Sequence, residues 1–178
     1  MAQLEEMQVT FNVAALDTTF EFTDNGSSGP LGTGDDADGG TFTPAASFYF
    51  VTPVSEQFHA GIAIASQGGS GMDYGDNFKG QNLMENVEFM TVQIAPAMSY
   101  KINSQWSVGA AVNFEYFSAQ GELDVLPNTV PGIAQGVLEA EADDFNIGYS
   151  LSAFYQPNQK HRFGLFTVLK LPIMAKVM

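Results

Sequence analysis

The dominant pattern along this chain is a strict alternation of apolar residues with small or polar residues. A period of two is typical of a β-strand with one apolar face. Five segments share it: residues 41–51, 58–65, 90–100, 106–116 and 145–155. We also expect a first strand over residues 7–22, with a bulge near Ala14 and Ala15 where the apolar phase changes, and a last strand from residue 162. The fold class we predict is all-β, an antiparallel meander of about seven strands.

The connections between these strands alternate between long and short. Long ones are expected over residues 23–40, 66–87 and 121–143, and short ones over residues 52–57, 101–105 and 156–161. In a meander, this alternation puts every long loop at one end of the sheet and every short turn at the other. Outer-membrane β-barrels are built in this way. Tyr100, Trp106 and Tyr155 lie where an interfacial aromatic belt would run.

Composition narrows the classes of function. Of the 178 residues, 45% are hydrophobic and only 15% are charged, below the roughly one quarter of an ordinary soluble domain. The 20 acidic and 6 basic residues give a formal charge of −14, which argues against nucleic acid because phosphate binding needs Lys and Arg. The sequence has no cysteine for a disulfide or a thiolate metal site, and it shows neither a membrane-spanning apolar helix nor an export signal.

A family resemblance is carried by seven ordered segments, residues 47–55, 61–64, 72–78, 97–103, 106–109, 155–157 and 162–165. They resemble the long-chain fatty acid transporter (FadL) family of outer-membrane proteins, over most of residues 1–165. The resemblance implies a barrel, plugged by an N-terminal hatch, that passes hydrophobic compounds across the outer membrane. Seven strands would form only part of that barrel.

The same resemblance implies a sideways exit at a kink in the third strand. Here the kink matches six residues: Ser66, Gln67, Gly68, Gly69, Ser70 and Gly71. The residues themselves agree, because glycines inside a strand weaken its pairing and favour a bend or bulge. The alternative is an ordinary glycine-rich loop base.

Two further groups of residues are candidates for ligand contact. The third long loop is unusually apolar, and either it captures a hydrophobic ligand or residues 131–141 form a short helix that caps the barrel. Its apolar residues are Leu123, Val125, Leu126, Val130, Ile133, Val137 and Leu138. Polar residues of the opposite strand faces would line a lumen or fill the interior by hydrogen bonding: Gln93, Asn113, Glu115, Asn146, Ser150 and Ser152.

Other chemistry has weaker support. Asp35, Asp36 and Asp38 could bind calcium, but the EF-hand spacing is absent and a flexible acidic loop is preferred. Residues 73–76 either order the second loop through turn hydrogen bonds or form a solvated turn without function, and the second interpretation is preferred. His59 and His161 flank short turns and are interpreted as interfacial residues. The segment 68–72 lacks the last glycine of a nucleophile elbow, so we predict no enzyme, and we expect no metal or cofactor.

Both ends of the chain depart from the family pattern. Met1 resembles the residue that ends the family's hatch, so the hatch would lie outside this chain. The alternation is lost over residues 166–178, which we interpret as an out-of-frame tail on a single partial β-barrel domain, residues 1–178. The gene's nucleotide sequence would test this interpretation.

The sequence therefore predicts passive diffusion of hydrophobic compounds, such as fatty acids or aromatic hydrocarbons, across the outer membrane. The expected partners are those compounds, outer-membrane lipid or detergent, and further copies of the chain that complete a barrel. The alternative is a soluble extracellular β-sandwich that binds a ligand or calcium through acidic loops.

Overall fold

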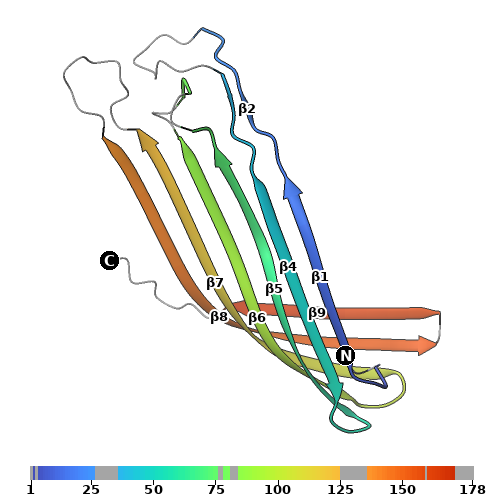
Figure 1. Cartoon of the computed structure of the whole chain (residues 1–178). Coiled ribbons are helices and arrows are strands. Elements are labelled where there is room, and N and C mark those ends of the chain that lie inside the picture. The colour runs from blue at the N-terminus through green and yellow to red at the C-terminus, as the bar shows by residue number, and fades with distance from the viewer. Residues whose placement is uncertain are drawn as a thin grey trace.

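The chain forms one long antiparallel sheet and one small sheet (Figure 1). The computed structural model describes residues 2, 4–26, 36–75, 78–80, 84–124, 136–158 and 160–170. The large sheet contains, in chain order, β1 (Gln8–Asp17), β4 (Phe42–Pro53), β5 (Phe58–Asp73), β6 (Asn86–Lys101), β7 (Trp106–Asp124), β8 (Val137–Asn158) and β9 (His161–Lys170). The small sheet pairs β2 (Glu21–Phe22) with β3 (Ala37–Asp38). The predicted meander of seven strands is confirmed.

Long and short connections alternate as predicted. The short ones cover residues 54–57, 102–105 and 159–160, and the long ones cover residues 18–41, 74–85 and 125–136. The short turns and the N-terminus lie at the lower end of the sheet in Figure 1, and β2 lies at the upper end. We call these ends the turn end and the loop end. Asn103 stabilises one turn, because its Oδ1 accepts hydrogen bonds from the backbone N–H groups of Gln105 and Trp106, each at 2.8 Å.

The strand register separates two faces of the large sheet. One row across the sheet contains Ala65, Gln93, Glu115 and Asn146, and the adjacent row contains Ile64, Ile94, Phe114 and Ile147. We call the first the inner face and the second the outer face. Seven of the buried residues lie on the inner face: Val51, His59, Ala65, Ala95, Ser99, Ser107 and Asn113. The outer face keeps its apolar residues exposed, and within the described part of the chain no second sheet covers it, so the β-sandwich alternative is wrong.

The apolar outer residues form a band between aromatic side chains. On β7 the band runs from Trp106 to Tyr116, about 33 Å at about 3.3 Å per residue. A strand tilt of about 40° reduces this to a height of about 25 Å, which is the height of the apolar band of outer-membrane barrels. Trp106 stacks on Tyr155 with ring centroids 4.3 Å apart, and Tyr100 lies on the same face of the neighbouring strand. The predicted belt residues therefore lie close together on the outer face.

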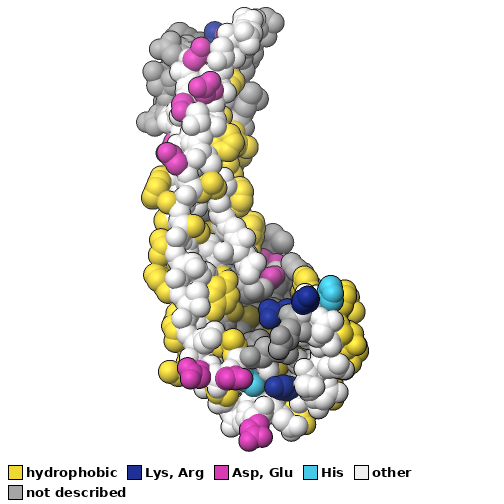
Figure 2. Space-filling model, turned by 90° about the vertical axis from the view of Figure 1, so that its right-hand side faces the viewer, with side chains coloured by type: hydrophobic (Ala, Val, Ile, Leu, Met, Phe, Trp, Pro, Cys, Tyr) yellow, Lys and Arg dark blue, Asp and Glu magenta, His cyan; other side chains and the backbone are white. Residues whose placement is uncertain are grey.

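Three strands extend further toward the loop end than the sequence predicted. β5 continues to Asp73, β7 to Asp124, and β8 begins at Val137, so the second and third long connections are shorter than expected. Several acidic residues assigned to loops lie instead on the outer face of the ends of β7 and β8: Glu122, Glu139, Glu141 and Asp143. Beyond the apolar band, polar and apolar residues no longer alternate. For this reason the sequence predicted loops where these strand ends lie. Figure 2 shows acidic side chains at the upper and lower ends, with hydrophobic side chains between.

The bulge predicted near Ala14 and Ala15 is wrong. β1 pairs with β4 in one continuous register from Gln8 opposite Val51 to Asp17 opposite Phe42. The change of apolar phase has no bulge behind it: Leu16 is opposite Thr43 and lies on the inner face of β1, whereas Val13 lies on the outer face, and the chain leaves the sheet only after Asp17 and re-pairs in β2. Thr18 marks the departure, because its N–H and its hydroxyl both donate to the carbonyl oxygen of Thr41, at 3.1 and 3.0 Å.

The last strand continues past the point where the alternation is lost. β9 pairs with β8 as far as Lys170 opposite Gly148, so residues 166–170 belong to the sheet, whereas residues 171–178 and Met1 lie outside the described residues. The lower half of β8 and all of β9 turn across the base of the sheet in Figure 1. Nowhere in the described ranges is there a helix of the length and apolarity needed to cross a membrane.

Candidate functional site: a window between β4 and β5

The ladder between β4 and β5 ends halfway along both strands. It runs from Pro53 opposite His59 to Ser47 opposite Ala65. Beyond that pair, β4 continues to Phe42 with β1 as its partner, and β5 continues to Asp73 with β6 as its partner. The two strands therefore separate toward the loop end.

A bulge in β5 lies where the separation begins. The register between β5 and β6 shifts between Ser66 and Gly68, so that Gln67 is the extra residue. Bulges bend a strand and increase its local twist. The bulge predicted from the glycine-rich segment is confirmed, and the alternative of a loop base is wrong because residues 66–71 all belong to β5.

The separated strands come together again at the loop end. The Thr41 hydroxyl donates to the carbonyl oxygen of Gly71 at 2.7 Å, and the backbone N–H of Asp73 donates to that of Gly39 at 3.0 Å. The region between the last ladder pair and these bonds is a bounded opening in the sheet. We call it the window, formed by residues 42–46 of β4 and residues 66–71 of β5.

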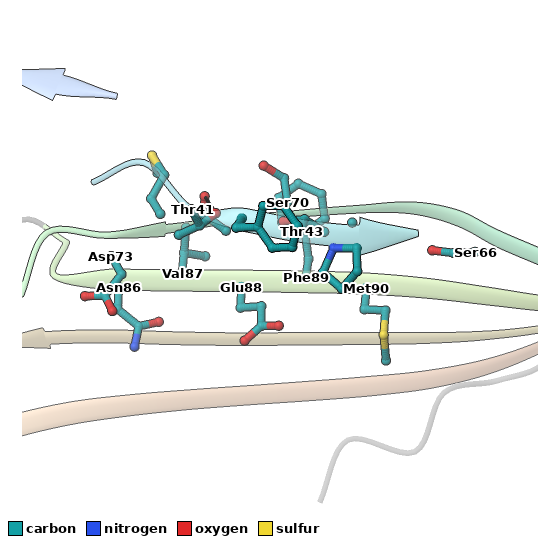
Figure 3. Close-up of a pocket in the computed structure, with 15 residues that line it drawn as sticks. Thr41, Thr43, Ser66, Ser70, Asp73, Asn86, Val87, Glu88, Phe89 and Met90 are labelled. Carbon is teal, nitrogen blue, oxygen red and sulfur yellow. Dashed lines mark hydrogen bonds between the residues drawn. The ribbon is translucent and has the colours of Figure 1, made fainter. Parts of the chain in front are cut away.

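A cavity of about 320 Å³ occupies the window and reaches the adjacent part of β6 (Figure 3). Its lining includes side chains from both faces of the sheet. By the register, Val87 and Phe89 belong to the inner face, and Glu88 and Met90 belong to the outer face. Figure 3 shows Glu88 and Met90 projecting to the same side of β6. The cavity therefore adjoins both faces of the sheet where the β4–β5 ladder has ended.

Two glycines keep the window narrow but open. A Cβ atom on Gly69 would lie 3.4 Å from Thr43 Cγ2, and one on Gly71 would lie 3.3 Å from Thr41 Oγ1. Thr43 therefore lies beside the Gly69 backbone, and Thr41 lies beside that of Gly71, to whose carbonyl oxygen it is hydrogen-bonded. Any larger side chain on β5 would occupy the space between the strands.

A row of polar side chains crosses the inner face at the edge of the window. The side-chain amide of Gln67 donates to Gln93 Oε1 at 2.7 Å, and that of Gln93 donates to Glu115 Oε1 at 3.2 Å. We call these three residues the polar row. The structure thus brings the bulge residue together with two predicted lumen residues. Asn113, the third, is 7% exposed on the same face, one row nearer the turn end.

An apolar surface lies on the inner face between the polar row and the loop end. Phe89 and Phe117 are 42% and 37% exposed there, and Leu123 pairs with Leu138 further on. Of the predicted capture residues, only these two leucines are described on this face. Val137 pairs with Asp124 on the outer face, and Val125, Leu126, Val130 and Ile133 lie outside the described residues. The capping helix over residues 131–141 is wrong from residue 137 onward, where β8 begins.

The loop-end connections hold each other through an aromatic cluster and an ion pair. Phe78 is 2% exposed, stacks on Tyr74 and packs edge-on against Phe22. Lys79 forms an ion pair with Asp24. No pattern in the sequence indicates this cluster, because its members come from two separate loops.

The acidic residues considered for calcium bind backbone N–H groups. Asp36 Oδ1 accepts from Asp24 at 2.9 Å, and Asp38 Oδ1 accepts from Phe20 and Gly40 at the same distance. Among the described residues no acidic or histidine cluster could hold a metal ion, and Asp35 lies outside them.

Asp73 forms a turn hydrogen bond of the kind considered from the sequence, because its Oδ1 accepts from the backbone N–H of Gly75 at 3.0 Å. Gly75 adopts a φ of 67°, a conformation that favours glycine. This turn leads the chain out of β5 toward the aromatic cluster.

His59 differs from its expected interfacial position. It is 3% exposed on the inner face at the turn end, and its Nε2 donates to the carbonyl oxygen of Leu4 at 2.7 Å. His59 therefore holds the segment before β1 against the sheet. His161 is exposed beside its turn, as expected.

These features define a class of protein. An antiparallel sheet with an apolar outer band, flanking aromatic side chains and a polar inner face is the wall of an outer-membrane β-barrel. A family model described as "Outer membrane protein transport protein (OMPP1/FadL/TodX)" matches residues 1–168, and the chain belongs to that family. Proteins of this family lie in the outer membrane of Gram-negative bacteria, which is therefore where this chain belongs.

Individual relatives agree with the family assignment. The chain is 22% identical over 155 residues to a long-chain fatty acid transport protein of Escherichia coli O6:H1, covering 75% of this chain and 35% of the relative. It is 26% identical over 112 residues to the protein of that name from Escherichia coli K12, covering 60% and 24%. The chain thus spans about a third or less of these relatives.

A solved structure shows the same fold. The crystal structure of a Pseudomonas aeruginosa FadL homologue superposes with a TM-score of 0.64 at 16% sequence identity. The superposition covers 92% of this chain and 45% of that chain. The seven strands described above therefore correspond to part of a larger barrel wall.

Proposed function

We propose that this protein lets hydrophobic compounds cross the outer membrane by passive diffusion and leave sideways through the window. The supporting observation is the break in the β4–β5 ladder, which is lined by residues of both faces and leads to an apolar outer surface. Fatty acids and aromatic hydrocarbons are the substrates we propose. The names of the Escherichia coli relatives support the first of these.

The proposed route starts at the loop end. A hydrophobic compound is captured by the apolar residues around Leu123 and Leu138 and moves along the inner face past Phe117 and Phe89. The polar row limits its movement toward the turn end, because burying apolar surface against amide and carboxylate groups is unfavourable. The compound then passes the window and reaches the outer face.

The outer rim of the window suits release into lipid. Phe42 is 67% exposed and Met90 is 45% exposed on this rim. Transfer of an apolar compound from the lumen to lipid needs no energy input, because burial of apolar surface drives it at about 25 cal/mol per Å². The protein supplies a path and no covalent chemistry.

A closed wall is part of this proposal. β1 and β9 are the two edges of the sheet, and unpaired backbone groups are not tolerated in lipid. Further strands or a second copy of the chain would pair them. In both edge strands the chain runs from the turn end to the loop end. Two copies in the same orientation would therefore pair β1 of one copy with β9 of the other as parallel strands. Chemical cross-linking in micelles would distinguish a monomer from such an assembly.

The test of the proposed function compares two glycine variants. Cells lacking their own transporter of this family would produce the wild type, Gly69→Leu or Gly164→Leu, and uptake of radiolabelled dodecane and oleate would be measured. Leucine at position 69 fills the window beside Thr43, so uptake should fall to the level of cells without the protein. Gly164 on β9 has no atom within 4 Å of its Cβ position, and its variant should transport normally.

Equal amounts of folded protein are required for this comparison, and heat-modifiable gel mobility provides the check. Uptake by wild-type cells no greater than in cells without the protein would contradict transport. Normal uptake by folded Gly69→Leu would contradict the lateral route.

A further inference from the structure

The outer face carries a groove in the part of the apolar band nearest the turn end. A cavity of about 430 Å³ lies across β5, β6, β7 and β8, and its lining includes one row of residues across these strands: Ala60, Met98, Ala110 and Leu151. A second cavity of about 380 Å³ adjoins it, because both are lined by Phe58 and by three residues of this row. We call the two cavities together the outer groove.

Small side chains alternate with larger ones along this row. Ala60 and Ala110 each have a single methyl group, whereas Met98 and Leu151 are larger and are 54% and 49% exposed. Each alanine therefore lies lower than the side chain on the neighbouring strand. A surface of this shape can contact a flexible apolar chain on several sides, which favours binding through dispersion.

The outer groove also lies over a gap in the β6–β7 ladder. The register is the same on both sides of the gap, but two successive pairs are missing between Ile94 opposite Phe114 and Ala97 opposite Ala111. Pro96 lies in this gap, and proline has no backbone N–H to donate to a neighbouring strand. Pro96, Ala97 and Ala111 all line the first cavity. The groove therefore follows an irregularity of the wall as well as the pattern of side-chain sizes.

The depth of the outer groove places it in one half of the membrane. On β7 it runs from Val108, the next outer-face residue after Trp106, to Val112, near the midpoint of the band between Trp106 and Tyr116. This is about 13 Å along the strand and about 10 Å in height at a strand tilt of about 40°. The short turns of outer-membrane barrels face the periplasm. The groove therefore lies in the periplasmic half of the membrane, beside the aromatic belt.

We propose that the outer groove holds one acyl chain of a phospholipid from the periplasmic leaflet. The groove is continuous with the lipid-facing band, and among the described residues none that lines it is charged. Surrounding lipid is as apolar as the groove, so the preference comes from dispersion contacts and not from exclusion of water. Tyr100 lines the end nearest the belt, which places the head group at the level of the belt. This inference depends neither on the window nor on transport.

The test is photo-cross-linking in liposomes. The full chain is refolded into phosphatidylethanolamine and phosphatidylglycerol with a small fraction of phosphatidylethanolamine that carries a diazirine in one acyl chain, and mass spectrometry locates the adducts. Val9 and Val13, which are 58% and 69% exposed on the outer face of β1, report ordinary lipid contact. Adducts at Ala60, Met98 and Ala110 should be about tenfold more frequent than at these valines, because a chain in the groove contacts protein on several sides.

Two variants fill the outer groove, and a third is the matched control. Ala110→Phe fills it from β7 and Ala60→Phe from β5, and each should reduce adducts at Met98 to the frequency at Val9. Val13→Phe adds a ring to the outer face of β1 and should leave the adducts in the groove unchanged. Heat-modifiable mobility checks that each variant folds, and if one filling variant does not fold, the other decides.

Three outcomes would overturn the proposal. Equal labelling of the groove and of β1 in the wild type would show ordinary lipid contact only. Unchanged labelling at Met98 in a folded filling variant would place the bound chain elsewhere. Labelling of the groove by a diazirine fatty acid but not by the phospholipid would assign it to a transported compound.

Discussion

The two ladders β7–β8 and β4–β5 belong to the same sheet but differ in continuity. β7 and β8 pair without interruption from Trp106 opposite Tyr155 to Asp124 opposite Val137. β4 and β5 stop pairing at Ser47 opposite Ala65, although both strands continue. β7 and β8 stay paired both within the apolar band and beyond it, where Glu122 and Glu139 lie on the outer face, so the polarity of the outer face does not explain the difference.

Both strands differ from β7 and β8 where the ladder ends: β4 contains Pro44, which has no backbone N–H, and β5 contains the glycine-rich segment. Between Ser66 and Gly71 this strand has three glycines and one extra residue, Gln67, whereas the paired parts of β7 and β8 have large side chains on the outer face. Glycine contributes no cross-strand side-chain packing, and an extra residue changes the direction of the strand. The β4–β5 ladder thus ends where a few residues of the two strands are unsuited to pairing.

The largest effect on uptake is expected from deleting Gln67, because β5 would then have no bulge, as β8 has none where it pairs with β7. Without the extra residue, the register of β5 with β6 becomes continuous, and β5 can continue its ladder with β4 through the window. Uptake of hydrophobic compounds should fall about tenfold or more as the strands pair. The measurement is uptake of radiolabelled oleate by whole cells that produce the deletion variant or the wild type.

Gln67→Ala is the matched control for the deletion. It keeps the bulge but removes the hydrogen bond to Gln93, so uptake should fall much less than in the deletion. Unchanged uptake in the folded deletion variant would show that the bulge does not maintain the opening.

A smaller effect is expected from Thr41→Val, which removes the hydroxyl that bridges the window to Gly71. Loss of this bond should cost about 1 kcal/mol and open the loop end of the window. Amide hydrogen exchange should become faster at Gly39, Thr41 and Asp73 and stay unchanged along β7. Thr10→Val, on β1 away from the window, is the control, and equal exchange changes in both variants would contradict the bridge.

The sequence predicted the parts of the fold that face lipid. Strand positions followed from alternation, as in residues 106–116, because every second residue there contacts an apolar environment. The ends of β7 and β8 could not be predicted, because Glu122 and Glu139 on their outer face are acidic beyond the apolar band. Polar strand extensions have no periodic signal to distinguish them from loops.

The glycines in the sequence indicated where the candidate site lies, but not which contacts form it. The glycine-rich segment indicated where β5 bends. The contacts that shape the window join residues far apart in the chain, as Thr41 with Gly71 and Gln67 with Gln93 do. Such contacts depend on the register across a bulge, and the sequence does not specify that register.

The most direct test of the central claim uses a reversible lock across the window. The chain has no cysteine, so the pair Thr43→Cys and Gly69→Cys can form a single disulfide where Thr43 Cγ2 and the Gly69 Cβ position are 3.4 Å apart. The pair Ser47→Cys and Ala65→Cys joins the same strands where they are already paired and is the control.

Uptake of radiolabelled oleate would be measured before and after reduction. The account predicts that the oxidised window pair abolishes uptake, that reductant restores it, and that the control pair transports normally in both states. Undiminished uptake with the window disulfide fully formed would contradict the claim that hydrophobic compounds leave between β4 and β5.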